Sequence, residues 1–359
     1  MNLHETEHKI ASSSRTSGGP AGSSTSPAVS VVMPVHNALP YLDEAIESIL
    51  SQTYSDFEFV ILDDASTDGS AERLAEWAER DPRIRLIRAE YNLGPALSSQ
   101  RVANEASAPI VARMDADDIS LPDRIAEQVA VLEQNPGVGV VGGLYDIIDD
   151  SGRIVRRPEQ RRLVRRAVFP PFGNGPLMYR RKIFDKVGGY RKACEFWEDQ
   201  DLIIRMAAIT KVMVIPHSVY RMRQSRNSTR VVSEQWRLEQ AIDLMYRSRA
   251  AFEHSGNYEA VLTEPNLRAK VDPRVFIALG SITLWAGGRP RLFKRFLERA
   301  RLSSDFTSFS AFVWTGWASL SPSTLRIFMR LLVAMRNASG PRRIATDAPV
   351  YWSPLRSSR

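Results

Sequence analysis

The segment Phe57–Ser70, FEFVILDDASTDGS, decides the fold. Apolar, β-favouring residues run from Phe57 to Leu62, and Asp63 and Asp64 end that run. Asp68-Gly69-Ser70 follows and is typical of the start of a helix. A short apolar strand that ends in acidic residues and leads into a helix is the repeating unit of an α/β protein.

The same unit recurs on both sides of this segment. We expect strands at residues 31–33, 84–87, 109–114 and 138–141, and helices at 42–50, 94–106 and 121–132. This alternation with short links predicts a mostly parallel sheet with helices on both faces. Ligands bind beyond the carboxyl ends of the strands in such sheets, so the polar residues that follow the strands are the first site candidates.

The regular alternation stops after Gly143. A hairpin around residues 150–152, a basic helical stretch, a loop at 170–176, helices after Arg180 and at 199–209, and strands at 212–215 and 218–222 are expected next. Three regions are therefore predicted: a disordered tail at 1–27, a domain at 28–230 made of halves 28–120 and 121–230, and a mainly helical region at 231–359.

Composition narrows the functional class. The chain has 359 residues, a net charge of +7 and one cysteine, Cys194, which excludes an internal disulfide and a cysteine-based zinc site. No signal peptide and no apolar run of about 18 residues is visible, which favours a cytoplasmic location. Residues 151–192 contain thirteen Lys or Arg and two acidic residues, a pattern that fits either a solvated basic surface or attraction to phosphates.

Three acidic clusters are the candidates for chemistry. Asp115 and Asp117 could hold a hard divalent cation against a diphosphate, whereas Asp118 or Ser120 could simply cap the next helix. Asp63 and Asp64 fit either a turn or a carboxylate that contacts a nucleoside. The third cluster, Trp197-Glu198-Asp199-Gln200-Asp201, fits either complementation of a helix dipole or a general base in a pocket.

Five ordered blocks resemble those of the family 2 glycosyltransferases. The blocks are Val31–Asn37, Asp63–Ser70, Asn92-Leu93-Gly94 with Arg101, Ala112–Asp118, and Val187–Tyr190 followed by Glu198–Leu202 and Arg205. The resemblance covers residues 29–225, about half the chain. It departs from the family at Ala65, where glycine is usual, and at Gln100, where asparagine is common.

The resemblance implies a GT-A fold, which is a Rossmann-like α/β sandwich, and a hexosyltransferase-like enzyme that uses a nucleotide sugar, most often UDP-linked. It implies that Asp63 or Asp64 contacts the base and ribose, and that Pro34, Asn37 and Arg101 line the same cleft. It also implies that Asp115 and Asp117 face the diphosphate and a Mn²⁺ or Mg²⁺ ion, with Asp117 as the preferred direct ligand. Asp199 would be the base that activates the acceptor in an inverting reaction, and Trp197, Glu198 and Asp201 would lie on the acceptor side.

Other readings compete with this one. A nucleotidyltransferase of sugar phosphates would have a glycine-rich loop after the first strand, where this chain has Pro34-Val35-His36-Asn37. No Gly-x-Gly-x-x-Gly follows a strand, which disfavours a dinucleotide-dependent oxidoreductase, and no nucleic-acid motif accompanies the basic stretch. A nucleotide- or membrane-binding module without catalysis is disfavoured because all three acidic clusters are present.

The C-terminal region allows two interpretations. Apolar residues at helical spacing between Leu325 and Met335 fit a helix packed on the catalytic domain or an interfacial helix on the inner face of the cytoplasmic membrane. Membrane contact would suit a lipid-linked saccharide acceptor in surface polysaccharide or glycolipid synthesis, and a soluble saccharide is the alternative acceptor.

Overall fold

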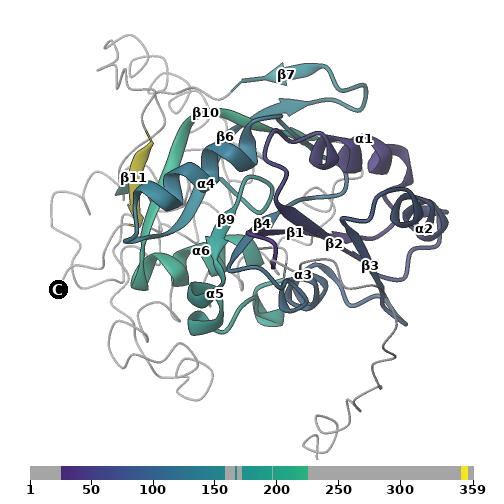
Figure 1. Ribbon diagram of the computed structural model, residues 1–359, viewed down its shortest axis with the longest axis horizontal. Helices are drawn as coiled ribbons and strands as arrows, with labels where there is room; N and C mark the ends of the chain where they lie inside the picture. Colours follow the sequence, from purple (N-terminus) through teal and green to yellow (C-terminus); the bar gives the residue numbers. More distant parts are fainter. Residues whose placement is uncertain (1–25, 158–165, 168–171, 196, 225–348, 355–359) are drawn as a thin grey trace, which may run out of the picture.

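The computed structural model describes residues 26–157, 166–167, 172–195, 197–224 and 349–354. They form an α/β structure around an eleven-stranded sheet, with the strand order β3-β2-β1-β4-β9-β6-β10-β11-β8 along its main path (Figure 1). The expected mostly parallel sheet with helices on both faces is confirmed. The disordered tail and most of the mainly helical region at 231–359 lie outside the described residues, and the proposed domain boundaries stay predictions.

The first half follows the alternation of the sequence. Its elements are β1 (Val29–Val35), α1 (Leu39–Leu50), β2 (Phe57–Asp63), α2 (Ser70–Arg80), β3 (Ile84–Arg88), α3 (Pro95–Asn104) and β4 (Ile110–Arg113). Strands β3, β2, β1 and β4 are parallel neighbours, and Val35 of β1 pairs with Asp63 of β2. The carboxyl ends of these strands therefore meet at one edge of the sheet.

The second half is more irregular. Its elements are β5 (Ile119–Ser120), α4 (Arg124–Gln134), β6 (Val138–Ile148), β7 (Ile154–Arg156), β8 (Arg166–Ala167), β9 (Met178–Arg180), α5 (Arg181–Val187), η2 (Lys192–Cys194), α6 (Glu198–Ile209), β10 (Lys211–Arg223) and β11 (Val350–Pro354). The short strand β9 lies antiparallel between β4 and β6, and the expected hairpin joins β6 to β7. The two strands expected at 212–215 and 218–222 are one strand, β10, whose register shifts between Ile215 and Ser218.

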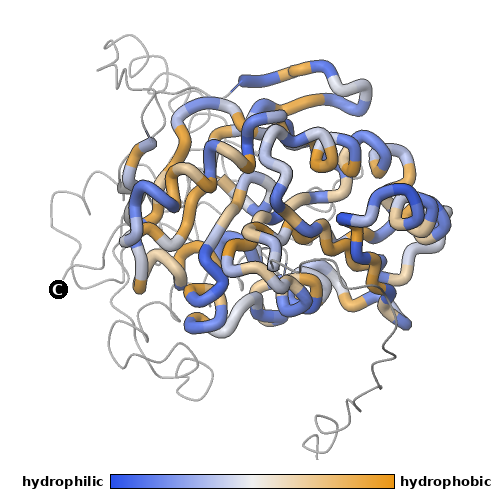
Figure 2. The backbone as a smooth tube through the Cα atoms, viewed as in Figure 1, coloured by the Kyte–Doolittle hydropathy of each residue, from blue (hydrophilic) through white to orange (hydrophobic). Residues whose placement is uncertain are grey.

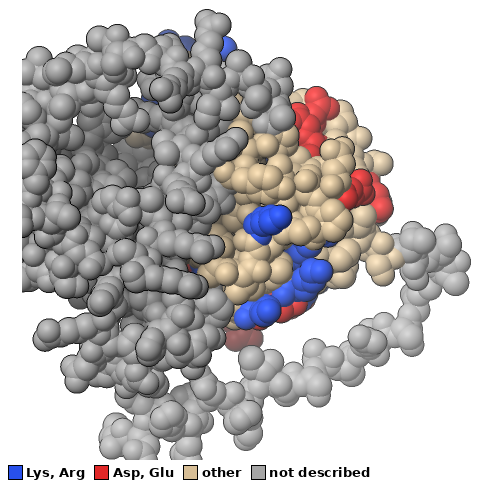
Figure 3. All heavy atoms as spheres, turned by 90° about the vertical axis from the view of Figure 1, so that its left-hand side faces the viewer, with Lys and Arg blue, Asp and Glu red and all other residues tan. Residues whose placement is uncertain are grey.

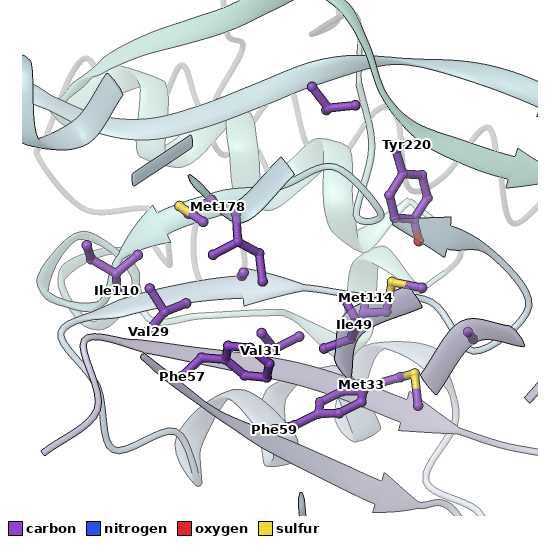
Figure 4. Close-up of a cluster of buried hydrophobic side chains, with 14 of the residues drawn as sticks. Val29, Val31, Met33, Ile49, Phe57, Phe59, Ile110, Met114, Met178 and Tyr220 are labelled. Carbon is purple, nitrogen blue, oxygen red and sulfur yellow. The ribbon is translucent and has the colours of Figure 1, made fainter. Parts of the chain in front are cut away.

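Two hydrophobic cores lie on opposite faces of the sheet, one beneath α1, α2 and α4 and the other beneath α3, α5 and α6 (Figure 1). Side chains of β1 alternate between them, because Val31 and Met33 join the first core and Val32 joins the second. Figure 4 shows Val31, Met33 and Phe59 of neighbouring strands within the first core. The hydropathy colouring of Figure 2 accordingly places apolar residues along the strands and polar ones on the outer turns of the helices.

The described part of the basic stretch lies mostly on the surface, where Arg153, Lys182 and Lys186 are exposed, and two of its arginines donate to backbone carbonyl groups. Arg180 donates to the carbonyl oxygens of Leu132 and Val138, and Arg181 donates to that of Asn104. Figure 3 shows the described surface on one side of the molecule, where Lys and Arg atoms form small separate groups. None of the helices in the described ranges has the length and apolar character needed to cross a membrane.

Candidate functional site

Asp63 and Asp64 lie at the carboxyl end of β2, where both are almost completely buried. The carboxylate of Asp64 accepts hydrogen bonds from the backbone N–H groups of Leu93 at 2.8 Å and Gly94 at 3.2 Å. The Asp63 carboxylate accepts one from the N–H of Ser66 at 3.1 Å. Asp64 thus fixes the loop before α3 against the end of β2, and Asp63 shapes the turn that follows β2.

Asn37 and Ala65 give this edge an unusual backbone, since both have a positive φ, +52° and +55° respectively. Asparagine tolerates this left-handed conformation, and the Asn37 side-chain oxygen also accepts a hydrogen bond from the N–H of Thr67 at 2.8 Å. Alanine gains no such compensation at position 65. The turn requires a left-handed conformation at this position, which explains why glycine is usual there and why alanine is strained.

His36 joins these loops, and sequence reasoning gave it no role. Its Nδ1 lies 2.8 Å from the carbonyl oxygen of Asp64, so Nδ1 carries the proton and Nε2 accepts from the side-chain amide of Asn92 at 2.9 Å. Pro34 is half-buried near the end of β1, and Arg101 on α3 donates to the carbonyl oxygen of Arg88 at 3.4 Å. The predicted nucleotide-side residues therefore occupy the ends of β1 and β2 and the adjoining helix α3.

The acidic loop Asp115–Asp118 follows β4. Asp115 is one-third exposed and forms an ion pair with Arg113 at 3.1 Å, whereas Asp118 is buried and accepts a hydrogen bond from the N–H of Arg223 at 2.7 Å. Burial and the neighbouring charge of Asp115 raise the pKa of Asp117 to about 6. Burial, helped by the charges of Asp117 and Asp115, also raises the pKa of Asp118. The loop therefore concentrates negative charge that a cation would stabilise.

Buried side chains from α4 and β10 hold this loop in place. Arg124 donates to the carbonyl oxygen of Arg113 at 2.5 Å and lies over the ring of Tyr220, 5.1 Å from its centroid. The hydroxyl of Tyr220 accepts the N–H of Asp115 at 3.2 Å. Arg223 donates to the carbonyl oxygen of Asp117 at 2.8 Å.

The donor set of the loop fits a divalent cation that completes its coordination elsewhere. No group of three or more metal-ligating side chains occurs in the part of the chain that the structure describes. Asp115 and Asp117 nevertheless offer carboxylate oxygens, which Mg²⁺ and Mn²⁺ prefer, and Mg²⁺ typically uses one or two carboxylates together with substrate phosphates and water.

Glu198 and Asp199 begin α6. Glu198 is buried, and burial together with the charge of Asp199 raises its pKa to about 8. Asp199 is half-buried, and its Oδ2 lies so close to Gly173 that a Cβ at that glycine would be 2.6 Å away. Trp197 packs against the second core. Two carboxyl groups thus share a confined region at the start of this helix.

Asp201, which the resemblance places on the acceptor side, lies in a buried group of ion pairs. It is fully buried and forms ion pairs with Arg191 and with Arg205, the latter at 2.6 Å. Arg205 in turn donates to the backbone carbonyls of Val187 and Gly189. The Asp201 carboxylate therefore joins α6 to the turn after α5 and is separated from solvent.

The acidic loop and the start of α6 face the same buried region around Tyr190. Burial raises the pKa of Tyr190, Arg113 opposes that shift, and the charges of Glu198, Asp199 and Asp115 add to it. The charge of Asp115 also contributes to the raised pKa of Glu198. A further contact reaches the nucleotide side, because Lys192 donates to the carbonyl oxygen of Leu93 at 3.3 Å. Charges of the acidic loop and of the start of α6 thus act on the same buried tyrosine, and Lys192 contacts the 92–94 loop that Asp64 holds.

The comparisons with known proteins point to one family. The model of "Glycosyl transferase family 2" matches residues 30–191. The putative glycosyltransferase EpsE of Bacillus subtilis is 36% identical over 186 residues, which cover 50% of this chain and 66% of EpsE. The O-antigen biosynthesis glycosyltransferase WbnJ of Escherichia coli is 32% identical over 184 residues, which cover 50% of this chain and 71% of WbnJ.

A solved structure supports the fold. The crystal structure of Staphylococcus aureus TarS 1–349 in complex with UDP-GlcNAc aligns with a TM-score of 0.56 at 16% identity and covers 77% of this chain and 81% of TarS 1–349. The chain spans only about half to two thirds of the length of several of the relatives that it matches. The similarity to WbnJ, which extends over more than two thirds of that relative, nevertheless shows that the chain belongs to glycosyltransferase family 2.

Proposed function

We propose that this glycosyltransferase moves a sugar from a UDP-linked donor to a hydroxyl of a saccharide or lipid-linked saccharide, with inversion at the anomeric carbon. The observation that carries the proposal is that the acidic loop and the start of α6 are linked through consecutive residues of one segment. Gly175 lies against Tyr220, whose hydroxyl accepts the N–H of Asp115, and the Asn174 amide donates to Glu198 at 3.3 Å. A transferase needs a donor diphosphate and an acceptor base next to each other. Relatives named for O-antigen and teichuronic acid biosynthesis support a role in surface polysaccharide synthesis.

On the donor side, Asp63 is our candidate for the contact with the base and ribose. Its carboxylate accepts one backbone N–H among the described residues, whereas both oxygens of Asp64 already accept backbone groups. Asp64 would then keep the 92–94 loop closed beside the nucleotide. Pro34, Asn37 and Arg101 complete this side of the cleft in the proposal.

Asp117 and Asp115 would hold Mn²⁺ or Mg²⁺ beside the donor diphosphate. Such an ion supplies charge neutralisation for the leaving diphosphate. Asp117 is the preferred direct ligand because Asp115 shares its charge with Arg113. Arg124, Tyr220 and Arg223 would hold the acidic loop in place while negative charge develops on the leaving diphosphate.

Asp199 would remove the proton of the acceptor hydroxyl, which then attacks the anomeric carbon from the face opposite the nucleotide. Burial raises the pKa of the neighbouring Glu198, which favours its protonated form, and a protonated Glu198 would donate a hydrogen bond to the acceptor. Trp197 would contribute to the acceptor side next to these two groups.

A panel of nucleotide sugars tests the proposed function. We expect UDP release with Mn²⁺ from one or a few UDP-sugars, an increase in release when a saccharide acceptor is added, and an inverted anomeric configuration by NMR. Release of pyrophosphate in place of UDP would indicate a nucleotidyltransferase.

The role of Asp199 is tested by Asp199→Asn. We expect kcat to fall by about 10²- to 10⁴-fold because the acceptor loses its base, with UDP affinity within twofold of wild type. The control Asp185→Asn changes an exposed acid on α5 and should leave both values unchanged. Transfer by Asp199→Asn within a few-fold of wild type would remove Asp199 from the mechanism.

A further inference from the structure

The segment Phe172–Leu177 contacts the start of α6 and also contacts β4, α4 and β10, the elements that adjoin the acidic loop. Its first three residues contact the first residues of α6, and the two segments run in opposite directions along this contact. The carbonyl oxygen of Phe172 accepts the Gln200 side-chain amide at 3.0 Å, Gly173 abuts Oδ2 of Asp199, and the Asn174 amide donates to Glu198 Oε1 at 3.3 Å. Consecutive residues of this segment are thus matched to consecutive residues at the start of α6, and the proposed reaction uses two of them, Asp199 and Glu198.

The other end of the segment is fixed to β4 and α4 and lies against Tyr220 of β10, which contacts the acidic loop. The carbonyl oxygen of Leu177 accepts the N–H of Arg113 at 2.8 Å, and that of Pro176 accepts the side-chain amide of Gln128 at 2.7 Å. Gly175 lies against the ring of Tyr220, whose hydroxyl accepts the N–H of Asp115. The segment therefore sets the separation between the acidic loop and the start of α6.

Asn174 is the polar centre of the segment. Its side-chain oxygen accepts the hydroxyl of Tyr190 at 2.8 Å while its amide donates to Glu198, so both ends of the side chain are used. The second carboxyl oxygen of Glu198, Oε2, is buried and has no hydrogen-bond partner among the described residues. A buried oxygen without a hydrogen bond costs free energy unless a ligand or water satisfies it. The Oε2 atom of Glu198 is therefore suited to a hydrogen bond with the acceptor saccharide.

We propose that Asn174 is a positioning residue for sugar transfer, which orients Glu198 and holds the neighbouring Asp199 at a fixed place relative to the acidic loop. This role rests on the proposed function of Asp199 and Glu198. Asn174 touches neither the donor nor the reacting atoms in the proposal. Gly173 also helps to position Asp199, because any larger residue at 173 would displace the Asp199 carboxylate.

The test is steady-state kinetics of Asn174→Ala with the best donor and acceptor. We expect kcat to fall on the order of 10- to 100-fold because the base is misplaced, with the donor KM and the UDP dissociation constant within about twofold of wild type. Asn135→Ala is the matched control, since the Asn135 side-chain amide also donates a hydrogen bond, in its case to the backbone carbonyl of Val131 at the end of α4. Its kcat should equal that of wild type.

Tyr190→Phe gives a second, milder variant that removes one hydroxyl. We expect a smaller loss of kcat, and the double variant with Asn174→Ala should lose no more than Asn174→Ala alone, because both act through one chain of hydrogen bonds. An Asn174→Ala kcat within twofold of wild type, or fully additive losses in the double variant, would overturn the positioning role. A wild-type enzyme that is inactive with every donor would instead overturn the proposed function, and with it this role.

Discussion

Ala65 has a left-handed backbone conformation that a residue with a Cβ atom rarely adopts. Its φ of +55° is left-handed, which costs a non-glycine residue about 1–2 kcal/mol. Glycine would relieve that strain but lose about 0.4–1 kcal/mol through its more flexible unfolded chain. We therefore expect Ala65→Gly to stabilise the protein by about 0.5–1 kcal/mol, measured as a higher midpoint of urea unfolding.

The matched control is Ala78→Gly, which places the same substitution inside α2. A helix interior disfavours glycine by roughly 1 kcal/mol, so this variant should be less stable than wild type. If both substitutions destabilise the protein by similar amounts, strain at position 65 is not what distinguishes Ala65.

Glu198 makes the stability of the protein depend on pH. Its folded pKa of about 8 lies above the ordinary 4.5, so its favourable contribution is complete below pH 4.5 and is lost as the pH rises to 8. Glu198→Gln removes this dependence while keeping the oxygen that accepts from Asn174. We expect the variant to gain about 1 kcal/mol or more over wild type between pH 5 and pH 8, measured by urea unfolding.

An exposed acid on α2 provides the control for this pH effect. Glu72→Gln should give the same difference from wild type at both pH values, since Glu72 lies on the surface. Parallel stability curves for wild type and Glu198→Gln from pH 5 to 8 would contradict a buried, protonated Glu198.

At the scale of elements, the end of β10 organises the acidic loop. The Arg223 guanidinium donates to the backbone carbonyls of Asp117, Asp149 and Asp150 and pairs with Glu44 of α1. It thereby links the acidic loop, the β6–β7 hairpin and α1. Lysine keeps the charge but presents it from a single ammonium, so it cannot span these partners.

We expect Arg223→Lys to weaken Mn²⁺ binding in the presence of UDP by about 10- to 100-fold, because residues that orient metal ligands typically matter to this extent. Isothermal titration measures the change. Arg221→Lys, two residues earlier on β10, is the control and should bind Mn²⁺ as wild type does. Unchanged Mn²⁺ affinity in Arg223→Lys would show that the acidic loop does not depend on β10.

The sequence predicted those elements whose signal is local. Two patterns predicted most of the first half: apolar runs that end in acidic residues, and helices with one apolar face, such as α1. The first pattern also identified the candidate carboxylates. It did not predict β9, since three residues carry too little periodicity, and it divided β10 at Pro216, where the register shifts. The burial of Asp201 between Arg191 and Arg205 depends on packing of α6 against the turn after α5, which residue spacing in the motif does not encode.

At the scale of the whole molecule, the proposed cation belongs to the reaction rather than to the fold. The acidic loop is already held by Arg124, Tyr220 and Arg223 through contacts between protein groups. We expect EDTA to reduce sugar transfer by at least about 100-fold while the melting temperature without donor changes by less than about 2 °C. Added Mn²⁺ should restore transfer. Transfer that persists in EDTA would remove the cation from the mechanism.

Strand β11 carries a consequence for how this protein is handled. Residues 350–354 return to the sheet and pair antiparallel with β10, from Val212 to Val214. A chain cut before residue 350 would leave that border of β10 with unpaired N–H and C=O groups, which invite a strand from another molecule. Shortened versions made for crystallisation should therefore self-associate, and those that keep β11 should behave better in solution.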